Sequence, residues 1–149
     1  KEEVFDIDFR ALSGTIKSLS KTKTGALIIV EKNSNLDYLV SSGIEINAKM
    51  SKDLLENIFF KNSPLHDGAV LIVDNKIKAA RCVLPLTEQE IDGNYGMRHR
   101  AALGISENSD CLAIIVSEET GEISFAVNSK FINQIEPAKV ESELRLNLN

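Results

Sequence analysis

Short runs of aliphatic residues are the feature that most constrains the fold of this chain. Each run has the length of one strand, and a continuous apolar run is typical of a strand that is covered on both faces. The runs are G-A-L-I-I-V-E at 25–31, A-V-L-I-V at 69–73, I-K-A-A-R-C-V-L at 77–84, L-A-I-I-V at 112–116 and I-S-F-A-V at 123–127. The sequence therefore predicts a sheet buried between helices.

The connections between these runs indicate how the strands pair. Asp74-Asn75-Lys76 predicts a tight hairpin turn between the second and third runs, and E-E-T-G at 118–121 predicts a turn between the last two. Residues 44–48 (I-E-I-N-A) alternate in polarity and predict an edge strand. We expect a mixed, largely antiparallel sheet.

Helical patterns fill the remaining segments. Apolar residues recur at helical spacing over 9–19, and Ser51 can cap a helix that continues to Phe60. Ser34-Asn35 precedes a shorter helix that Gly43 ends, and a helix with small residues is expected at 95–107. The tail from Ile135 is expected to be a peripheral helix or a frayed end. The fold class is α/β (mixed α+β), as a single domain over 1–149 whose motifs span 25–127.

Composition excludes some functions. The 149 residues suit one core, and the formal net charge of -5 comes without a lysine- or arginine-rich run. Long nucleic acid is therefore not expected as a partner, although a small anion needs only a local cationic patch. Neither a signal peptide nor an apolar stretch of about 20 residues is present. The chain opens K-E-E-V without an initiator methionine, so an upstream membrane anchor remains open.

The two cysteines, Cys82 and Cys111, each lie within an apolar, strand-like run. Two cysteines do not complete a zinc cage, and both are expected to be buried thiols in a reducing cytosol.

The segment S-P-L-H-D-G-A at 63–69 is the first candidate for chemistry, because it leads directly into a buried strand. Asp67 can bind a hard divalent cation, with His66 as a further ligand. Gly68 and Ala69 would allow a ligand to approach the backbone closely. Asp-Gly is also a common turn dipeptide, and on these residues alone a simple turn is the favoured interpretation.

The triplet R-H-R at 98–100 is the second candidate, because it opens a predicted helix. Helix N-termini bind anions, and arginines there are unfavourable until a negative partner arrives. On a regular helix Arg98 and Arg100 diverge by roughly 200°, so both meet one ligand only in an irregular first turn. The alternative is a solvated basic face paired with Glu88, Glu90 or Asp92.

Together these segments resemble the diadenylate cyclase family. The resemblance rests on G-A-L-I-I-V-E at 25–31, S-P-L-H-D-G-A-V at 63–70, R-H-R-A-A-L-G-I-S-E at 98–107 and I-V-S-E-E-T-G at 115–121. The helix L-L-E-N-I-F-F resembles the membrane-associated branch more than the branch fused to DNA-binding domains. One departure is Met97, which stands where the family commonly has threonine.

The resemblance implies condensation of two ATP molecules into cyclic di-AMP, with a divalent metal ion (Mn, Mg or Co) as cofactor. It also implies a face-to-face homodimer as the catalytic unit. The catalytic domain would be cytoplasmic, and a membrane anchor at the inner face of the membrane, or a regulator, would lie outside this segment. The other interpretations are a non-catalytic nucleotide-binding sensory module and a structural interaction domain.

The resemblance also assigns roles to residues. Asp67 would lie near the attacking 3′-hydroxyl with the metal, and His66 would be an additional metal ligand. Arg98, His99 and Arg100 would hold the triphosphate and stabilise the leaving pyrophosphate. The other expected ATP contacts are Gly68, Ala69 and Leu84 around the ribose and adenine, Met97 beside the arginines, Ser117 at a phosphate, and Glu118 as a metal or water partner.

Overall fold

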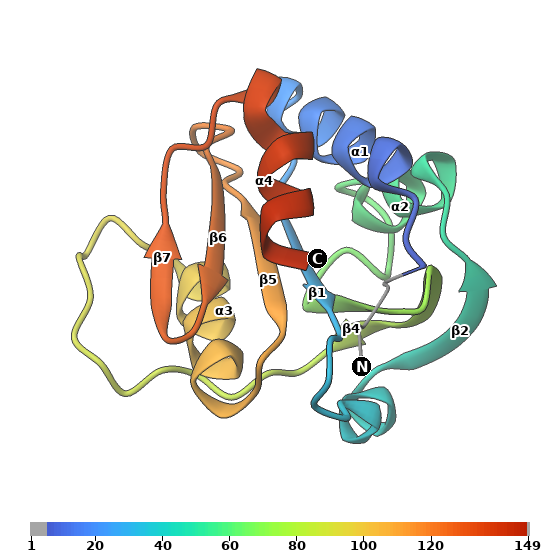
Figure 1. The fold of residues 1–149 in the computed structure, drawn as a ribbon, viewed down its shortest axis with the longest axis horizontal. Helices are drawn as coiled ribbons and strands as arrows, with labels where there is room; N and C mark the ends of the chain where they lie inside the picture. Colours follow the sequence, from blue (N-terminus) through green and yellow to red (C-terminus); the bar gives the residue numbers. More distant parts are fainter. Residues whose placement is uncertain (1–5, 149) are drawn as a thin grey trace.

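Strand β1 lies at the centre of a seven-stranded sheet in the computed structural model, which describes residues 6–148 (Figure 1). The strand order is β2-β4-β3-β1-β5-β6-β7. The strands are β1 (Ala26–Val30), β2 (Ile44–Lys49), β3 (Ala69–Val73), β4 (Lys76–Cys82), β5 (Leu112–Val116), β6 (Ile123–Val127) and β7 (Lys130–Ile132). Among the strand pairs of residues 6–148, β1 with β3 is the parallel one and the others are antiparallel. The expected mixed, largely antiparallel sheet is confirmed.

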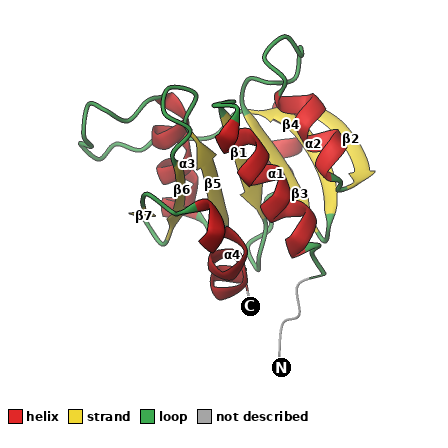
Figure 2. Ribbon diagram, turned by 90° about the horizontal axis from the view of Figure 1, so that it is seen from above, coloured by secondary structure: helices red, strands yellow, loops and turns green. Residues whose placement is uncertain are grey.

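Both faces of the sheet are covered by helices, as Figure 2 shows from above. Ile28 of β1 packs under α1 (Phe9–Lys21), α2 (Lys52–Phe59) and α4 (Val140–Leu148). Its neighbour Ile29 points the other way, toward α3 (Met97–Asn108) and the 3₁₀ helix η1 (Asp37–Ser42). A second 3₁₀ turn, η2 (Pro137–Lys139), precedes α4. The unbroken apolar run of β1 is therefore explained by burial on both sides.

Two helices begin with a side-chain cap, of which the sequence predicted the one at Ser51. Asp8 Oδ1 accepts a hydrogen bond from the Ala11 N–H at 2.9 Å, and Ser51 Oγ accepts one from the Leu54 N–H at 3.1 Å. Each cap satisfies a backbone donor that the first helical turn leaves without a partner.

Three expectations needed correction at the ends of elements. The helix expected after Ser34-Asn35 is a 3₁₀ helix that begins at Asp37, although Asn35 Oδ1 does accept the Asp37 N–H at 2.8 Å. Strand β4 ends at Cys82 rather than at residue 84, and α3 begins at Met97 rather than at residue 95.

The C-terminal part holds more structure than the sequence indicated. Strand β7 was not predicted, since three residues carry too little pattern to be recognised. The tail is a true helix, α4, whose Val140, Leu144 and Leu148 are fully buried against the core. Of the two alternatives expected for the tail, the helix is confirmed for residues 140–148 and the frayed end is not.

The mixed pairing brings distant motifs to one edge of the sheet. Because β1 runs parallel to β3, the residues just before both strands lie at the same edge; the register pairs Ile28 with Val70. Because β1 runs antiparallel to β5, the residues just after β5 lie there too, with Ala26 opposite Val116.

Candidate active site

A cavity of about 830 Å³ lies at this edge of the sheet. Three segments line it: the Asp67-Gly68 pair before β3, residues 93–99 at the start of α3, and residues 115–120 with Glu122 around the β5–β6 turn. These are three of the four motif segments that the sequence singled out, and the fourth, 25–31, contains the central strand.

The cavity separates the candidate residues into two groups. Those that line it are Asp67, Gly68, Met97, Arg98, His99, Ser117 and Glu118. Those that are not among its lining residues are His66, Ala69, Leu84 and Arg100. The roles assigned to both groups stay predictions, but the first group lies around one cavity.

Asp67 presents its carboxylate to solvent, with 82% of the side chain exposed. Within the described part of the chain, the ionisable side chain that it contacts is the imidazole of His66, whose Nε2 lies 3.3 Å from Asp67 Oδ1. The other ring nitrogen, Nδ1, lies 2.8 Å from the Ser63 carbonyl oxygen, which fixes the ring. Asp67 is therefore free to meet a cation or a hydroxyl that enters the cavity.

Gly68 has a structural reason to be glycine. Its φ is +82°, and a Cβ there would lie 2.8 Å from the Cys82 carbonyl oxygen. The turn interpretation and the site interpretation of Asp-Gly are thus compatible, because the turn is what holds Asp67 at the cavity.

Arg98 is held at the cavity by an ion pair. Its Nη1 donates a hydrogen bond to Glu118 Oε1 at 3.1 Å. The Arg98 side chain is 23% exposed. The alternative interpretation, a basic face paired with Glu88, Glu90 or Asp92, is not supported, because within residues 6–148 the partner of Arg98 is Glu118. Arg98 Nε is buried and has no hydrogen-bond acceptor among the described residues. The guanidinium thus retains donors for an anion.

His99 points away from solvent, in contrast to Arg98. It is 9% exposed, and its ring lies 4.8 Å from that of Tyr95 and 5.9 Å from that of Phe131 of β7. Burial lowers the pKa of His99, with Glu122 opposing this effect and Arg98 adding to it. The buried ring, tilted against Tyr95 and edge-on to Phe131, packs the first turn of α3 against β7.

Arg100 follows the regular geometry of the helix. Its N–H bonds to the Gly96 carbonyl at 3.2 Å, and its own carbonyl accepts the Thr87 N–H at 3.1 Å. The first turn is therefore α-helical rather than irregular, and the divergence of Arg98 and Arg100 holds. Gly96 caps α3 without a side-chain hydrogen bond, which leaves the N–H groups of the first turn open to a ligand.

Ser117 begins the turn between β5 and β6. Its Oγ accepts the N–H groups of Glu119 and Thr120, at 3.1 and 3.2 Å, so its hydroxyl hydrogen stays available. Ser20 of α1 anchors the same turn, because its Oγ donates to the Gly121 carbonyl at 2.6 Å.

The charge of the cavity bears on a metal cofactor. Among the described lining residues Arg98 is the one arginine or lysine, while Asp67, Glu118, Glu119 and Glu122 carry carboxylates. No cluster of three or more His, Cys, Asp or Glu side chains suited to a metal occurs within residues 6–148. One or two carboxylates with substrate phosphates is nevertheless the usual Mg²⁺ site, so these residues fit a metal carried in with a triphosphate.

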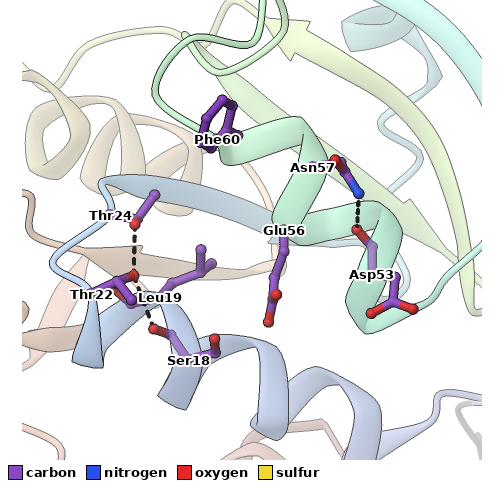
Figure 3. Close-up of a pocket in the computed structure, with 8 residues that line it drawn as sticks. All are labelled: Ser18, Leu19, Thr22, Thr24, Asp53, Glu56, Asn57 and Phe60. Carbon is purple, nitrogen blue, oxygen red and sulfur yellow. Dashed lines mark hydrogen bonds between the residues drawn. The ribbon is translucent and has the colours of Figure 1, made fainter.

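A second cavity, of about 570 Å³, lies between α1 and α2 (Figure 3). Its lining includes Ser18, Thr24, Glu56, Asn57 and Phe60. It contains no residue that the sequence assigned to chemistry. Phe60 is 57% exposed at this cavity, whereas its neighbour Phe59 is buried in the core.

Sequence reasoning missed several residues that line the first cavity. Gly93, Tyr95 and Gly96 belong to the loop before α3, and Glu122 follows the β5–β6 turn. The G-N-Y-G pattern at 93–96, with two glycines around an aromatic residue, was the available signal.

Both cysteines lie where the sequence placed them. Cys82 and Cys111 are buried, free thiols, and burial raises the pKa of each to about 11. None of the helices in the described part of the chain has the length and apolarity that a membrane span requires.

Comparisons with known proteins agree on one family. A family model described as "DisA bacterial checkpoint controller nucleotide-binding" (DAC) matches residues 13–131. The chain is 51% identical over 118 residues to the diadenylate cyclase CdaS of Bacillus thuringiensis, covering 78% of this chain and 59% of that protein. It is 48% identical over 128 residues to the cyclic di-AMP synthase CdaA of Bacillus subtilis, covering 85% and 47%. The chain thus spans about half of the length of these curated relatives.

Solved structures agree with the fold. DacA from Staphylococcus aureus, an N166C/T172C double mutant, superposes with a TM-score of 0.91 at 40% identity, over 94% of both chains. A hypothetical membrane spanning protein from Bacillus cereus superposes with a TM-score of 0.82 at 47% identity, over 85% of this chain and 63% of that one.

Proposed function

The chain belongs to the diadenylate cyclase family, and we propose that it condenses two ATP molecules into cyclic di-AMP with release of two pyrophosphates. The observation that carries the proposal is the meeting of Asp67, Arg98, Ser117 and Glu118 around one cavity. They come from three separate segments, so their meeting is a property of the fold. Relatives named as diadenylate cyclases support the same activity.

The reaction consists of two equivalent phosphoryl transfers. In each, the 3′-oxygen of one ATP attacks the α-phosphorus of the other, and the bond from that phosphorus to pyrophosphate breaks. A divalent metal ion, when bound, would neutralise phosphate charge and lower the pKa of the hydroxyl. Asp67, exposed at the cavity, is assigned to the attacking 3′-hydroxyl, whose proton its carboxylate can accept.

The phosphate chain is assigned to the start of α3 and the β5–β6 turn. Arg98 supplies cationic N–H donors, the first turn of α3 supplies backbone N–H groups, and Ser117 supplies a hydroxyl. These donors stabilise the charge that develops on the leaving pyrophosphate. His99 contributes through the shape of the first turn, whereas Arg100, which the regular helix directs away from Arg98, is not assigned to the same phosphates.

Metal dependence follows from the balance of charge. Four carboxylates and one arginine line the cavity, so a bare triphosphate would meet net repulsion. Asp67 and Glu118 are the residues proposed to hold the ion together with the phosphates, and His66 beside Asp67 is proposed as a further ligand. Metal-free ATP should accordingly bind weakly.

The product's two-fold symmetry favours a homodimer. Each chain would hold one ATP, and a two-fold axis would place each 3′-hydroxyl opposite the partner's α-phosphorus. The exposure of Asp67 supports this arrangement, because a group that acts across an interface must reach the surface of its own chain.

Attachment to a membrane is proposed for a longer form of the protein. The support is the likeness of this chain to the Bacillus cereus protein, which is described as membrane spanning. The catalytic domain would then work at the cytoplasmic side, within reach of a regulator.

Product analysis by mass spectrometry tests the proposal. The purified chain with ATP and Mn²⁺, Mg²⁺ or Co²⁺ should yield cyclic di-AMP, and specific activity should rise with protein concentration until the dimer is saturated. Tight ATP binding without product under all three metals would instead identify a non-catalytic sensory module. ATP that neither binds nor raises the melting temperature would identify an interaction domain, since a ligand at 100 times its Kd stabilises by about 2.7 kcal/mol.

A further inference from the structure

We propose that Gly25 positions Arg98, and that its lack of a side chain sets where the phosphate-binding guanidinium lies. The inference rests on the proposed function and extends it to a residue outside the cavity lining. Gly25 stands directly before β1, at the sheet edge where the cavity opens.

The contact between the two residues leaves no room for a methyl group. A Cβ built on Gly25 would lie 2.5 Å from Arg98 Nη1, 2.6 Å from Cζ and 2.9 Å from Nη2. All three distances are well below the roughly 3.5 Å at which nonbonded heavy atoms rest. The guanidinium therefore occupies the space that any other residue at position 25 would fill.

The same guanidinium is otherwise lightly held. Glu118 accepts one hydrogen bond from Nη1 at 3.1 Å, and the buried Nε has no acceptor among the described residues. A guanidinium carries five N–H donors, so most of them are left for a ligand. Gly25 on one side and Glu118 on the other thus define the position of Arg98.

A methyl group at position 25 would affect function more than stability. The atoms in its way are the end of a long, flexible side chain, which can rotate away, whereas the backbone can stay in place. The φ of Gly25 lies outside the left-handed region, so alanine meets no backbone strain. Displacement of the guanidinium by about 1 Å would cost up to about 100-fold in rate.

Gly25→Ala is the variant that tests this inference, and Gly14→Ala is its matched control. A Cβ on Gly14, in α1, would meet only the Lys52 side chain, with Cδ at 3.6 Å and Cε at 4.0 Å, which are ordinary contacts. We expect Gly25→Ala to weaken binding of inorganic triphosphate and to lower kcat/KM for ATP by about tenfold or more, with a nearly unchanged melting temperature. Gly14→Ala should change neither triphosphate binding nor turnover.

A double variant separates positioning from a general packing role. Because Gly25 acts through Arg98, Gly25→Ala should have almost no further effect on triphosphate binding in an Arg98→Ala background. Independent, multiplying effects of the two substitutions would contradict the proposal. So would a Gly25→Ala variant that fails to fold, since Gly25 would then serve packing rather than the placement of Arg98.

Triphosphate binding also keeps this inference separate from the proposed function. If the chain makes no cyclic di-AMP but Gly25→Ala still weakens triphosphate binding through Arg98, the positioning role stands and the cyclase assignment fails. If the chain makes cyclic di-AMP and Gly25→Ala binds and turns over ATP normally, the positioning role fails alone.

Discussion

Arg98 and Glu118 form an ion pair at the cavity, with Arg98 Nη1 donating to Glu118 Oε1 at 3.1 Å. The pair joins the first turn of α3 to the β5–β6 turn. It occupies one of the donors that a phosphate oxygen would use, so an incoming triphosphate and Glu118 compete for the same guanidinium.

Neutralising Glu118 should therefore strengthen the binding of metal-free anions. We expect Glu118→Gln to tighten the Kd for inorganic triphosphate in EDTA about two- to fivefold, the range of a partly exposed ion pair. Glu119→Gln is the control, because it removes the same charge from the next residue, which forms no ion pair with Arg98 in the described part of the chain. Isothermal titration at two salt concentrations measures both, and equal effects of the two substitutions would show only a change in overall charge.

Asp67→Asn should abolish product formation and leave the fold unchanged. Its side chain is 82% exposed, so the melting temperature should stay within about 2 °C of the wild-type value. Cyclic di-AMP formation should fall by about 100-fold or more, because proton transfer by a positioned group contributes at least that factor. Asp74→Asn is the control: Asp74 lies in the turn after β3, the strand that Asp67 precedes, and this variant should remain active. A fully active Asp67→Asn variant would remove Asp67 from the mechanism.

The two arginines of α3 should differ in their effect on binding. Arg98 lines the cavity and Arg100 does not, so Arg98→Ala should weaken triphosphate binding by about tenfold or more. The difference in triphosphate affinity between the wild type and Arg98→Ala should shrink at high salt, where both bind triphosphate weakly. Arg100→Ala should weaken binding less in the monomer. Equal losses at low protein concentration would show that both arginines meet the phosphates within one chain.

Stability should fall below neutral pH because of His99. Its pKa is lowered from 6.5 by burial, so the unfolded chain binds a proton more readily than the fold does. The contribution of His99 is therefore fully present above about pH 6.5 and is lost as pH falls toward the folded-state pKa, with a slope of at most about 1.4 kcal/mol per pH unit. Urea unfolding between pH 5 and 8 measures this slope. His99→Gln should flatten it, and an unchanged slope would assign the pH dependence to other groups.

Both thiols should resist modification in the native state. Cys82 and Cys111 are 1% and 0% exposed, and their pKa values of about 11 leave roughly one thiolate per thousand at pH 8. Iodoacetamide should label them rapidly only in denaturant, as intact-mass analysis can follow. Fast labelling without denaturant would indicate local opening of β4 or β5.

Local patterns in the sequence carried most of the fold. The apolar runs predicted β1, β3, β5 and β6 because burial on both faces leaves an unmistakable composition. β7 was not predicted because a strand of three residues is too short to show a periodic pattern of polar and apolar residues. The order of the strands was also beyond reach, since pairing of β1 with β3 and β5 depends on packing between distant segments.

The site was predictable in its parts but not in its arrangement. The motif at Asp67 and the triplet at Arg98 were both recognised, and the structure brings them to one cavity. The inward orientation of His99 depends on Phe131 of the unpredicted β7, so no local pattern could indicate it. The contact of Gly25 with Arg98 joins residues distant in sequence, and only the folded chain shows it.

The central position of β1 in the sheet also determines at which stage of synthesis the nascent chain is prone to aggregate. Its two neighbours, β3 and β5, are made much later in synthesis, and β5 comes last of the three. A nascent chain that has not yet reached Leu112 leaves one side of β1 without hydrogen-bond partners, and such a bare, apolar edge readily recruits other chains. Ribosome-bound chains that have not yet reached β5, and truncated chains that end before it, should accordingly depend on chaperones to stay unaggregated.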